Sequence, residues 1–538
     1  MNSFSLTQSL EFEEGGEIQN THQLEIAGEE HAIEEEKAFS ERRVSSVRDG
    51  GSDKDLEVGT DAQQTDEEEQ TAELHDPNIV GWEGDEDPAN PMNWSATMKW
   101  TMTGIVSLIT FIVPLASSMF APGVTQVTEE FHVSNTMLEE LVVSIYILGL
   151  AFGPLLLAPL SEVYGRWVIY TVSNIFYTVM TIACAVSSDM SMLIVWRFLA
   201  GCAGSSPLAI GAGTIADLFP IHQRGLALSF YALGPIVGPG IGPVVGGFLA
   251  EAKGWRWIFW LLTIMSGAIT VAQIAFMKET YAVTLLARKT KRLQKSTGNL
   301  QLRSKLDSGI PAREILIRAI IRPAKLTLLS PISILLSITA AFIYGILYLL
   351  LTTFPLVFEA QYGFSIGISG LTYIGLAVGN TAGLFIFSMT SDRYVSRRAA
   401  QGKLKPEDRL FPYFLVAGPL IAGGLFWYGW TAQAKTLWIA PIVGSALVGL
   451  GNMLFFMPVM GYLVDAFTVY AASAVAANTV LRSVGGALLP LAAESMYASL
   501  NYGWGNSLLA FLTLAFSPAL IALYLYGERI RLRYPVKV

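Results

Sequence analysis

Glycine and proline crowd one apolar segment of this 538-residue chain, where they occupy most of the ten positions from Gly238 to Gly247. In a water-exposed helix each glycine would cost about 1 kcal/mol and each proline about 3 kcal/mol. In lipid the same residues are tolerated, because small residues let helices approach closely and neighbouring helices satisfy the backbone groups that proline frees. We therefore expect a membrane helix here that packs tightly and bends at a defined point.

The composition agrees with a membrane location. Apolar residues make up 52% of the chain and charged residues 15%, whereas soluble domains carry about 25% charged residues. Residues 1–99 hold 26 of the 44 acidic residues and only five basic residues before Lys99. With few aromatic residues and several acidic runs, residues 1–95 are expected to form a disordered, acidic, cytosolic tail. The net charge of −9 belongs to this tail, and we expect no nucleic-acid partner.

Twelve apolar segments follow the tail, each close to the roughly 20 residues that a membrane-spanning helix needs. They centre near residues 110, 148, 177, 204, 237, 267, 342, 378, 421, 450, 484 and 516. The fifth and eleventh are the weakest, because glycine is dense there and Arg482 falls inside the eleventh. The expected fold class is an all-α membrane protein with two six-helix halves, residues 96–277 and 331–527.

Basic residues predict the orientation. The segment 278–330 between the halves carries twelve Lys or Arg against three acids, and the tail at 528–538 is also basic. By the positive-inside rule, both termini and this central loop lie in the cytosol. We expect a multi-pass protein of the plasma membrane, with the vacuolar membrane as the alternative.

A weak internal repeat supports two halves. Ser161 and Glu162 follow the second segment, and Ser391 and Asp392 follow the eighth, so an acid comes after serine at the same place in each half. Two six-span repeats joined by a basic loop are typical of a secondary transporter, with its substrate site near the bilayer midplane between the halves.

Several motifs, in this order and spacing, resemble the major facilitator superfamily, and within it the fungal twelve-span drug:proton antiporters that export toxins, fungicides and polyamines. Residues 158–166 resemble the superfamily's loop between spans two and three, although Ala158 replaces its first glycine and Glu162 its usual aspartate. Residues 193–201 resemble its span-four motif. Residues 90–94 and 254–260 resemble the fungal branch, and the resemblance covers about residues 88–527.

The glycine- and proline-rich run is similar to the span-five motif that the superfamily associates with antiport. Its matching residues are Gly238, Gly242, Pro243, Gly246 and Gly247. The resemblance therefore implies the major facilitator fold, alternating access by rocking of the two halves, and exchange of substrate for protons.

The residues at the predicted cytosolic rim are candidates for a conformational gate. A carboxylate at Glu162 can reach a helix N-terminus or a loop arginine, and Gly165 permits a tight turn. Arg166 can pair with an acid across the interface between the halves, and Asp217 is a plausible partner. Asp392 and Arg393 take the corresponding place in the second half. The alternative is an ordinary rim ion pair worth about 0–1 kcal/mol.

Arg197 lies inside the fourth segment, where an arginine costs at least about 2.5 kcal/mol on insertion scales. The resemblance implies that it faces the cavity and tunes a proton-carrying group. The alternative is a side chain that snorkels to the outer interface.

Other polar and aromatic residues are candidates for the substrate cavity. Asn478 and Arg482 lie on one helical face, where they could bond a substrate, each other or another helix. Aromatic side chains could line an apolar cavity, although such rings more often face lipid or other helices. The aromatic candidates are Tyr146, Tyr231, Tyr344 and Phe455.

Proton coupling normally needs an acid that titrates within the membrane, and the first segment has none between Trp100 and Pro122. Glu139 and Glu140 open the second segment, and Glu494 lies towards the outer end of the eleventh. Burial would raise the pKa of such a carboxyl group, but all three positions also suit hydrated rim residues.

No enzyme motif is found. The five histidines form no metal-binding pair, and the chain has neither a phosphate-binding loop nor a nucleophile elbow. We expect no catalytic residue, metal or cofactor. The resemblance implies a monomeric, proton-coupled exporter of hydrophobic or amphipathic small molecules such as toxins, fungicides or secondary metabolites. The alternatives are an uptake permease, a polyamine exporter, which the scarcity of acids in the spans disfavours, and a transport-dead receptor with a signalling tail.

Overall fold

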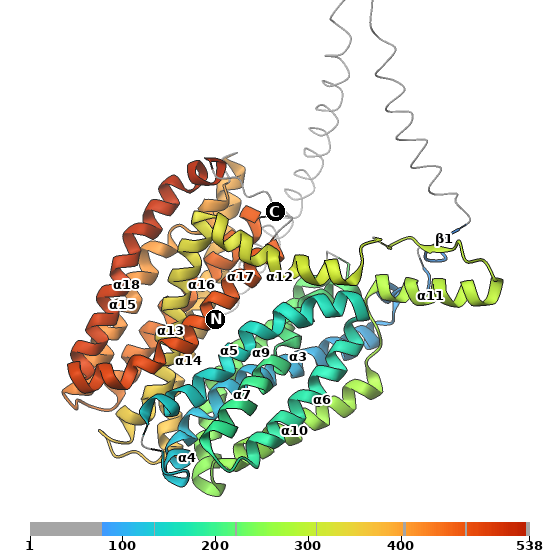
Figure 1. The fold of residues 1–538 in the computed structure, drawn as a ribbon. Helices are drawn as coiled ribbons and strands as arrows, with labels where there is room; N and C mark the ends of the chain where they lie inside the picture. The colour runs from blue at the N-terminus through green and yellow to red at the C-terminus, as the bar shows by residue number, and fades with distance from the viewer. Residues whose placement is uncertain are drawn as a thin grey trace, which may run out of the picture. The chain divides into compact units, whose positions relative to one another are not determined.

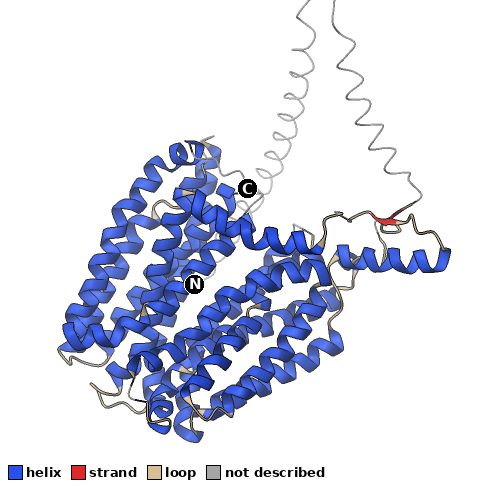
Figure 2. Cartoon of the chain, in the orientation of Figure 1, coloured by secondary structure: helices blue, strands red, loops and turns tan. Residues whose placement is uncertain are grey.

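The computed structural model describes residues 78–533, apart from residues 85, 134, 221–222, 308, 402–404 and 468–470. Most of the predicted acidic tail, residues 1–77, lies outside this range. The described part is built almost entirely of helices (Figures 1 and 2).

The N-terminal half contains six predicted spans. Its helices are α3 (Ala96–Met119), α4 (Val124–Glu130), α5 (Thr136–Tyr164), α6 (Arg166–Ala185), α7 (Met190–Gly204), α8 (Ser206–Leu218), α9 (Arg224–Lys253) and α10 (Arg256–Phe276), with the short 3₁₀ helices η1 (Pro91–Asn93) and η2 (Ala121–Gly123). Three of the α-helices have an N-cap side chain that accepts a hydrogen bond from the first turn. These N-caps are Ser95 for α3, Asn135 for α5 and Asp189 for α7. The fourth span is divided into α7 and α8, with Pro207 in the first turn of α8.

The C-terminal half supplies the other spans. Its helices are α13 (Pro331–Phe358), α14 (Ile366–Ala400), α15 (Tyr413–Gln433), α16 (Ile439–Phe467), α17 (Ala471–Leu488) and α18 (Ala493–Arg533), with η4 (Pro406–Arg409) and η6 (Pro490–Ala492). All twelve predicted centres fall within helices. By length and composition the described residues give 11 candidate spans rather than twelve, because Ser473–Arg533 counts as one. Non-helical backbone at Asn501 (φ 59°, ψ 174°) divides that stretch, which is consistent with separate eleventh and twelfth spans.

The segment between the halves is folded. It contains α11 (Ala282–Thr297) and α12 (Ala312–Leu329), and its strand β2 (Arg303–Ser304) pairs in parallel with β1 (Ile79–Val80). Near this strand pair, Lys289 Nζ lies 2.9 Å from Glu83 Oε1 and 3.5 Å from Asp87 Oδ2. Residues 78–95 are therefore part of the folded unit, and the tail boundary that composition places at residue 95 differs from the structure. Acidic composition does not reveal pairing with a basic segment more than 200 residues away.

Two helix pairs form the main contacts between the halves: α9 packs on α14, and α5 packs on α17. Within the N-terminal half, α9 also packs extensively on α3 (Figure 1). One large buried apolar cluster includes side chains from both halves, and a smaller one lies in the N-terminal half around Met102, Tyr170 and Leu218.

The glycine- and proline-rich run forms an uninterrupted helix, since α9 continues through Pro235, Pro239 and Pro243. Its glycines serve two faces. A Cβ atom at Gly238 would lie 3.0 Å from the backbone nitrogen of Leu115 in α3. A Cβ atom at Gly247 would lie 2.7 Å from the carbonyl oxygen of Ile366 at the start of α14. The small residues therefore allow close backbone approach on both sides of α9, as expected for helices packed in a membrane.

Candidate functional site

Arg166 and Asp217, two of the predicted gate residues, form an ion pair with 3.4 Å between Nε and Oδ2. Arg166 Nη1 also donates to Ser161 Oγ at 2.5 Å, and Thr280 Oγ1 donates to the same Asp217 oxygen at 3.4 Å. These four residues lie in α5, α6, α8 and the segment that follows α10. The pair therefore lies inside the N-terminal half, and the expectation that Arg166 pairs across the interface between the halves is not met.

Gly165 and the buried Glu279 explain the turn before α6. Gly165 has φ +95°, and a Cβ atom there would collide with the Glu279 carboxylate. Glu279 Oε1 accepts from the backbone N–H of Arg166 at 2.9 Å, and Oε2 accepts from that of Trp167 at 3.3 Å. A carboxylate at a helix N-terminus is stabilised by the free N–H groups and the helix dipole. The role of Glu279 could not be predicted from the sequence, because this contact joins positions 113 residues apart.

Glu162 is exposed and lies near Tyr281, which stacks under Arg166 with 4.6 Å between the guanidinium carbon and the ring centroid. Burial raises the pKa of Tyr281, the Glu162 charge adds to the rise, and Arg166 opposes it. The Glu162 carboxylate therefore belongs to the same charged cluster as the Arg166–Asp217 pair.

The second half contains an ion pair like Arg166–Asp217, at positions that the sequence repeat did not indicate. Arg409, before the ninth span, pairs with Asp465 at the foot of the tenth. Arg393 is exposed, and the side chain of Asp392 lies outside the described residues. The ion pair that corresponds in position to Arg166–Asp217 is therefore Arg409–Asp465.

Arg197 is 1% exposed and does not snorkel. Its guanidinium carbon lies 4.5 Å from the ring centroid of Phe120, 5.3 Å from that of Tyr146 and 5.8 Å from that of Phe259. Nη2 donates to the Val143 carbonyl at 3.4 Å, and Nε has no partner. Cation–π contacts within about 6 Å stabilise a desolvated arginine, so Arg197 is held inside the N-terminal half.

Arg482, Asn478 and Tyr344 are brought together in the C-terminal half. The guanidinium carbon of Arg482 lies 4.7 Å from the Tyr344 ring centroid and 5.3 Å from that of Phe456. Asn478 is fully buried and donates through Nδ2 to Ser337 Oγ at 3.3 Å. No hydrogen bond joins Asn478 to Arg482 among the described contacts.

A row of aromatic side chains connects the two arginines across the interface. Tyr344 and Tyr348 have ring centroids 5.0 Å apart, and the Tyr348 hydroxyl lies 3.3 Å from Ser117 Oγ of the other half. Tyr348 is also an electrostatic neighbour of Tyr146, the ring beside Arg197. The row therefore reaches from Arg197 to Arg482 and includes the contact between α3 and α13.

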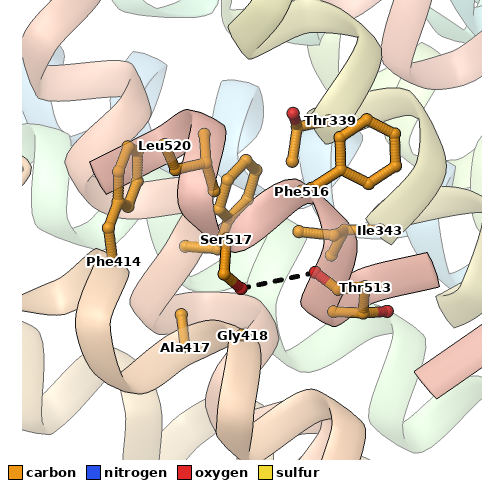
Figure 3. A pocket seen from close by; sticks show the side chains of 10 residues that line it. Thr339, Ile343, Phe414, Ala417, Gly418, Thr513, Phe516, Ser517 and Leu520 are labelled. Carbon is orange, nitrogen blue, oxygen red and sulfur yellow. Dashed lines mark hydrogen bonds between the residues drawn. The ribbon is translucent and has the colours of Figure 1, made fainter. Parts of the chain in front are cut away.

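The other two aromatic residues predicted to line the substrate cavity, Tyr231 and Phe455, pack inside their own halves. Tyr231 donates to the Pro207 carbonyl at 2.9 Å. Phe455 is 1% exposed and stacks on Phe414. It lines a small, mostly apolar cavity enclosed by α13, α15, α16 and α18 (Figure 3). Neither ring lies at the interface between the halves.

The halves also meet where α5 begins and α9 ends, which we name the seam end. Here Glu251 of α9 accepts from the Gly367 N–H at 2.7 Å and from Ser365 Oγ at 3.1 Å. The helix η2 contacts α13 and α14, and η6 contacts α5. The charge distribution predicts this end to be extracellular.

All three acids that were candidates for proton coupling gather at the seam end. Glu140 is 4% exposed, and its Oε2 has no hydrogen-bond partner. Glu139 on the same helix and Glu494 on α18 of the other half are its electrostatic neighbours. Thr352 of α13 lies within hydrogen-bonding reach of Glu140. The carboxylates therefore approach one another from both halves.

A sequence profile described as the Major Facilitator Superfamily matches residues 106–490, more than half of the chain. The chain belongs to the major facilitator superfamily. The MFS-type transporter hepF of Aspergillus oryzae is 58% identical over 471 residues, which are 86% of this chain and 96% of that protein. The efflux pump radE of Floropilus chiversii is 52% identical over 471 residues, which are 87% of this chain and 87% of that protein. These relatives confirm a transporter of the fungal branch and not an enzyme.

Solved structures confirm the superfamily fold. The partially occluded inward-open form of the E. coli xylose transporter XylE has a TM-score of 0.60 at 17% identity and covers 79% of this chain and 98% of its own. A bacterial homolog of the human lysosomal transporter Spinster has a TM-score of 0.58 at 14% identity and covers 82% of this chain and 100% of its own. At these identities the likeness concerns the fold alone. Membership of the superfamily makes the chain a multi-pass membrane transporter of small molecules.

Proposed function

We propose that this transporter exports hydrophobic or amphipathic small molecules, such as toxins, fungicides or secondary metabolites, in exchange for protons. The direction is supported by the relative named as an efflux pump and by the antiport motif of α9. The contacts at the seam end support a form that is closed on the predicted extracellular side. Both termini are proposed to be cytosolic, in the plasma membrane, and the transporter to act as a monomer.

The observation that carries the proton coupling is the position of Glu140. Its carboxyl group is buried between the halves beside two other carboxylates, and no ion pair with Lys or Arg joins any of the three within the described chain. A buried ionised carboxylate without a partner is costly, and like charges at one site cannot all ionise easily. The closed seam end therefore favours a proton on Glu140.

This position gives a cycle. When the seam end opens, Glu140 takes up a proton from the extracellular side, and the neutral side chain then allows closure. Release of the proton to the cytosolic side restores the charge. Repulsion between Glu140 and Glu494 then favours reopening, which carries bound substrate outward.

The test is drug export by the full chain in yeast that lacks its own pumps, with and without a protonophore, over a panel of toxicants. Glu140→Gln is expected to abolish protonophore-sensitive export while leaving surface expression unchanged. Glu314→Gln on α12 serves as the control and should export normally, because the Glu314 side chain is 45% exposed and pairs with Arg318 one turn away. Wild-type export by Glu140→Gln would disprove coupling through Glu140. Unchanged sensitivity to every compound, with the wild-type chain at the cell surface, would disprove efflux.

A further inference from the structure

Arg482 has an unmet need for a negatively charged partner. An arginine stays protonated in proteins, yet no acid pairs with Arg482 among the described residues. Its Nε is buried without a hydrogen-bond partner. Two rings, Tyr344 and Phe456, lie beside it, but the face of a ring supplies no hydrogen-bond acceptor in the guanidinium plane.

Asn478 adds a second unmet group on the same face of α17. It precedes Arg482 by one helical turn, and side chains four residues apart are neighbours on a helix. Its amide nitrogen bonds Ser337, whereas its Oδ1 is buried without a partner. A ligand that carries both an anionic oxygen and a hydroxyl group would satisfy Arg482 and Asn478 together.

Arg197 is more completely enclosed than Arg482. It is 1% exposed and has three rings around it. Arg482 is only partly buried and has two rings, so it is the less enclosed of the two arginines. Of the two arginines on the aromatic row, Arg482 is therefore the better candidate for contact with a ligand.

We propose that Arg482 and Asn478 form an anion subsite of the transport path, with the partly buried Tyr344 ring beside them. The fitting substrates are aromatic or conjugated molecules that carry one negative charge, as a carboxylate, phenolate or enolate, and a hydroxyl group. The anionic oxygen pairs with Arg482, and the hydroxyl donates to Asn478 Oδ1. A planar guanidinium binds such oxygens in a bidentate manner. This inference rests on the proposed function, because the subsite acts in transport only if the molecule is exported.

The subsite has an electrical consequence. Outward movement of one monoanion in exchange for one inward proton transfers two positive charges inward. An inside-negative membrane potential therefore drives the export of an anion more strongly than that of a neutral molecule.

The experiment is equilibrium binding to the purified full chain in detergent, with radiolabelled 6-hydroxy-2-naphthoate and its neutral methyl ester as probes. The wild type is expected to bind the anion at least about tenfold more tightly than the ester. Arg482→Gln should lose that preference, with the affinity for the ester changed less than about twofold. Arg482→Lys should keep part of it, because the charge remains and the bidentate geometry is lost.

Two further variants keep the test decisive. Asn478→Asp places a negative charge in the subsite and should abolish anion binding while sparing the ester. Arg318→Gln removes an exposed arginine of α12 and should behave as the wild type. A wild type without preference for the anion, or an equal loss of both probes in Arg482→Gln and Arg482→Lys, overturns the subsite. Binding needs no proton gradient, so a chain that prefers the anion but exports nothing would overturn only the proposed function.

Discussion

Arg166 at the start of α6 pairs with Asp217 at the end of α8, with 3.4 Å between Nε and Oδ2. Arg409 and Asp465 form the matching pair in the other half. Each pair joins the third span of its half to the fourth. These contacts brace each half internally, which suits a mechanism in which two rigid halves rock against each other.

We predict that Asp217→Asn lowers the melting temperature of the purified transporter. The change leaves the partly buried Arg166 without its counter-charge, which we expect to cost about 1–3 kcal/mol. The measurement is thermal unfolding in detergent. Glu162→Gln is the control, because Glu162 is exposed and its loss should change the melting temperature little. Equal shifts in the two variants would contradict the brace.

A second prediction concerns the close packing of α9 on α14. Gly247→Val places a branched side chain where a Cβ atom would already lie 2.7 Å from the Ile366 carbonyl oxygen. We expect loss of export with retained surface expression, because the seam end no longer closes. Gly267→Val in α10 is the matched control, since a Cβ atom there meets nothing within 4 Å. Normal export by Gly247→Val would show that close approach at this position is dispensable.

Glu359, just after α13, predicts a pH dependence of stability. Burial raises the pKa of Glu359 from 4.5 to about 7, and the nearby charge of Glu129 adds to the rise. Between these values the folded state keeps a proton that the unfolded state loses, so stability falls as pH rises from about 4.5 to about 7. We expect the melting temperature of the wild type to fall by a few degrees more over this range than that of Glu359→Gln. Parallel pH profiles for the two chains would refute this assignment.

The folded segment before α3 predicts where the tail can be removed. Deletion of residues 1–77 leaves β1 and the Lys289–Asp87 pair intact, so export and melting temperature should not change. Deletion of residues 1–90 removes both and should lower the melting temperature. A signalling receptor would instead lose its output in the shorter deletion while keeping its fold. Output assays and thermal unfolding on the same two truncations separate these outcomes.

Much of the fold could be predicted from the sequence, because span length and hydrophobicity are local properties. All twelve predicted centres fall in helices. The three acids chosen as coupling candidates also proved to be neighbours. Their selection needed only their position at the ends of two spans.

Contacts between distant helices could not be predicted in this way. The bonds of Glu279 to the start of α6, of Glu251 to Gly367, and of Arg409 to Asp465 depend on which helices pack together and in which rotation. The surroundings of Arg197 are a further case, since its three rings come from the end of α3, from α5 and from α10. A pattern within one span carries no information about the faces of its neighbours.

The position of α9 between α3 and α14 constrains how transporters of this kind diverge. A Cβ atom at Gly240 would lie 2.6 Å from Ala377 Cβ of α14, and Gly242 lies against Ser118 of α3 in the same helix. A residue larger than alanine at position 377 is therefore compatible only with glycine at position 240. Likewise, a residue larger than serine at position 118 is compatible only with glycine at position 242. Substitutions in the two halves are thus coupled through a single helix. Paired changes across related sequences should trace both faces of α9 and reveal which residues of one half evolve together with the other.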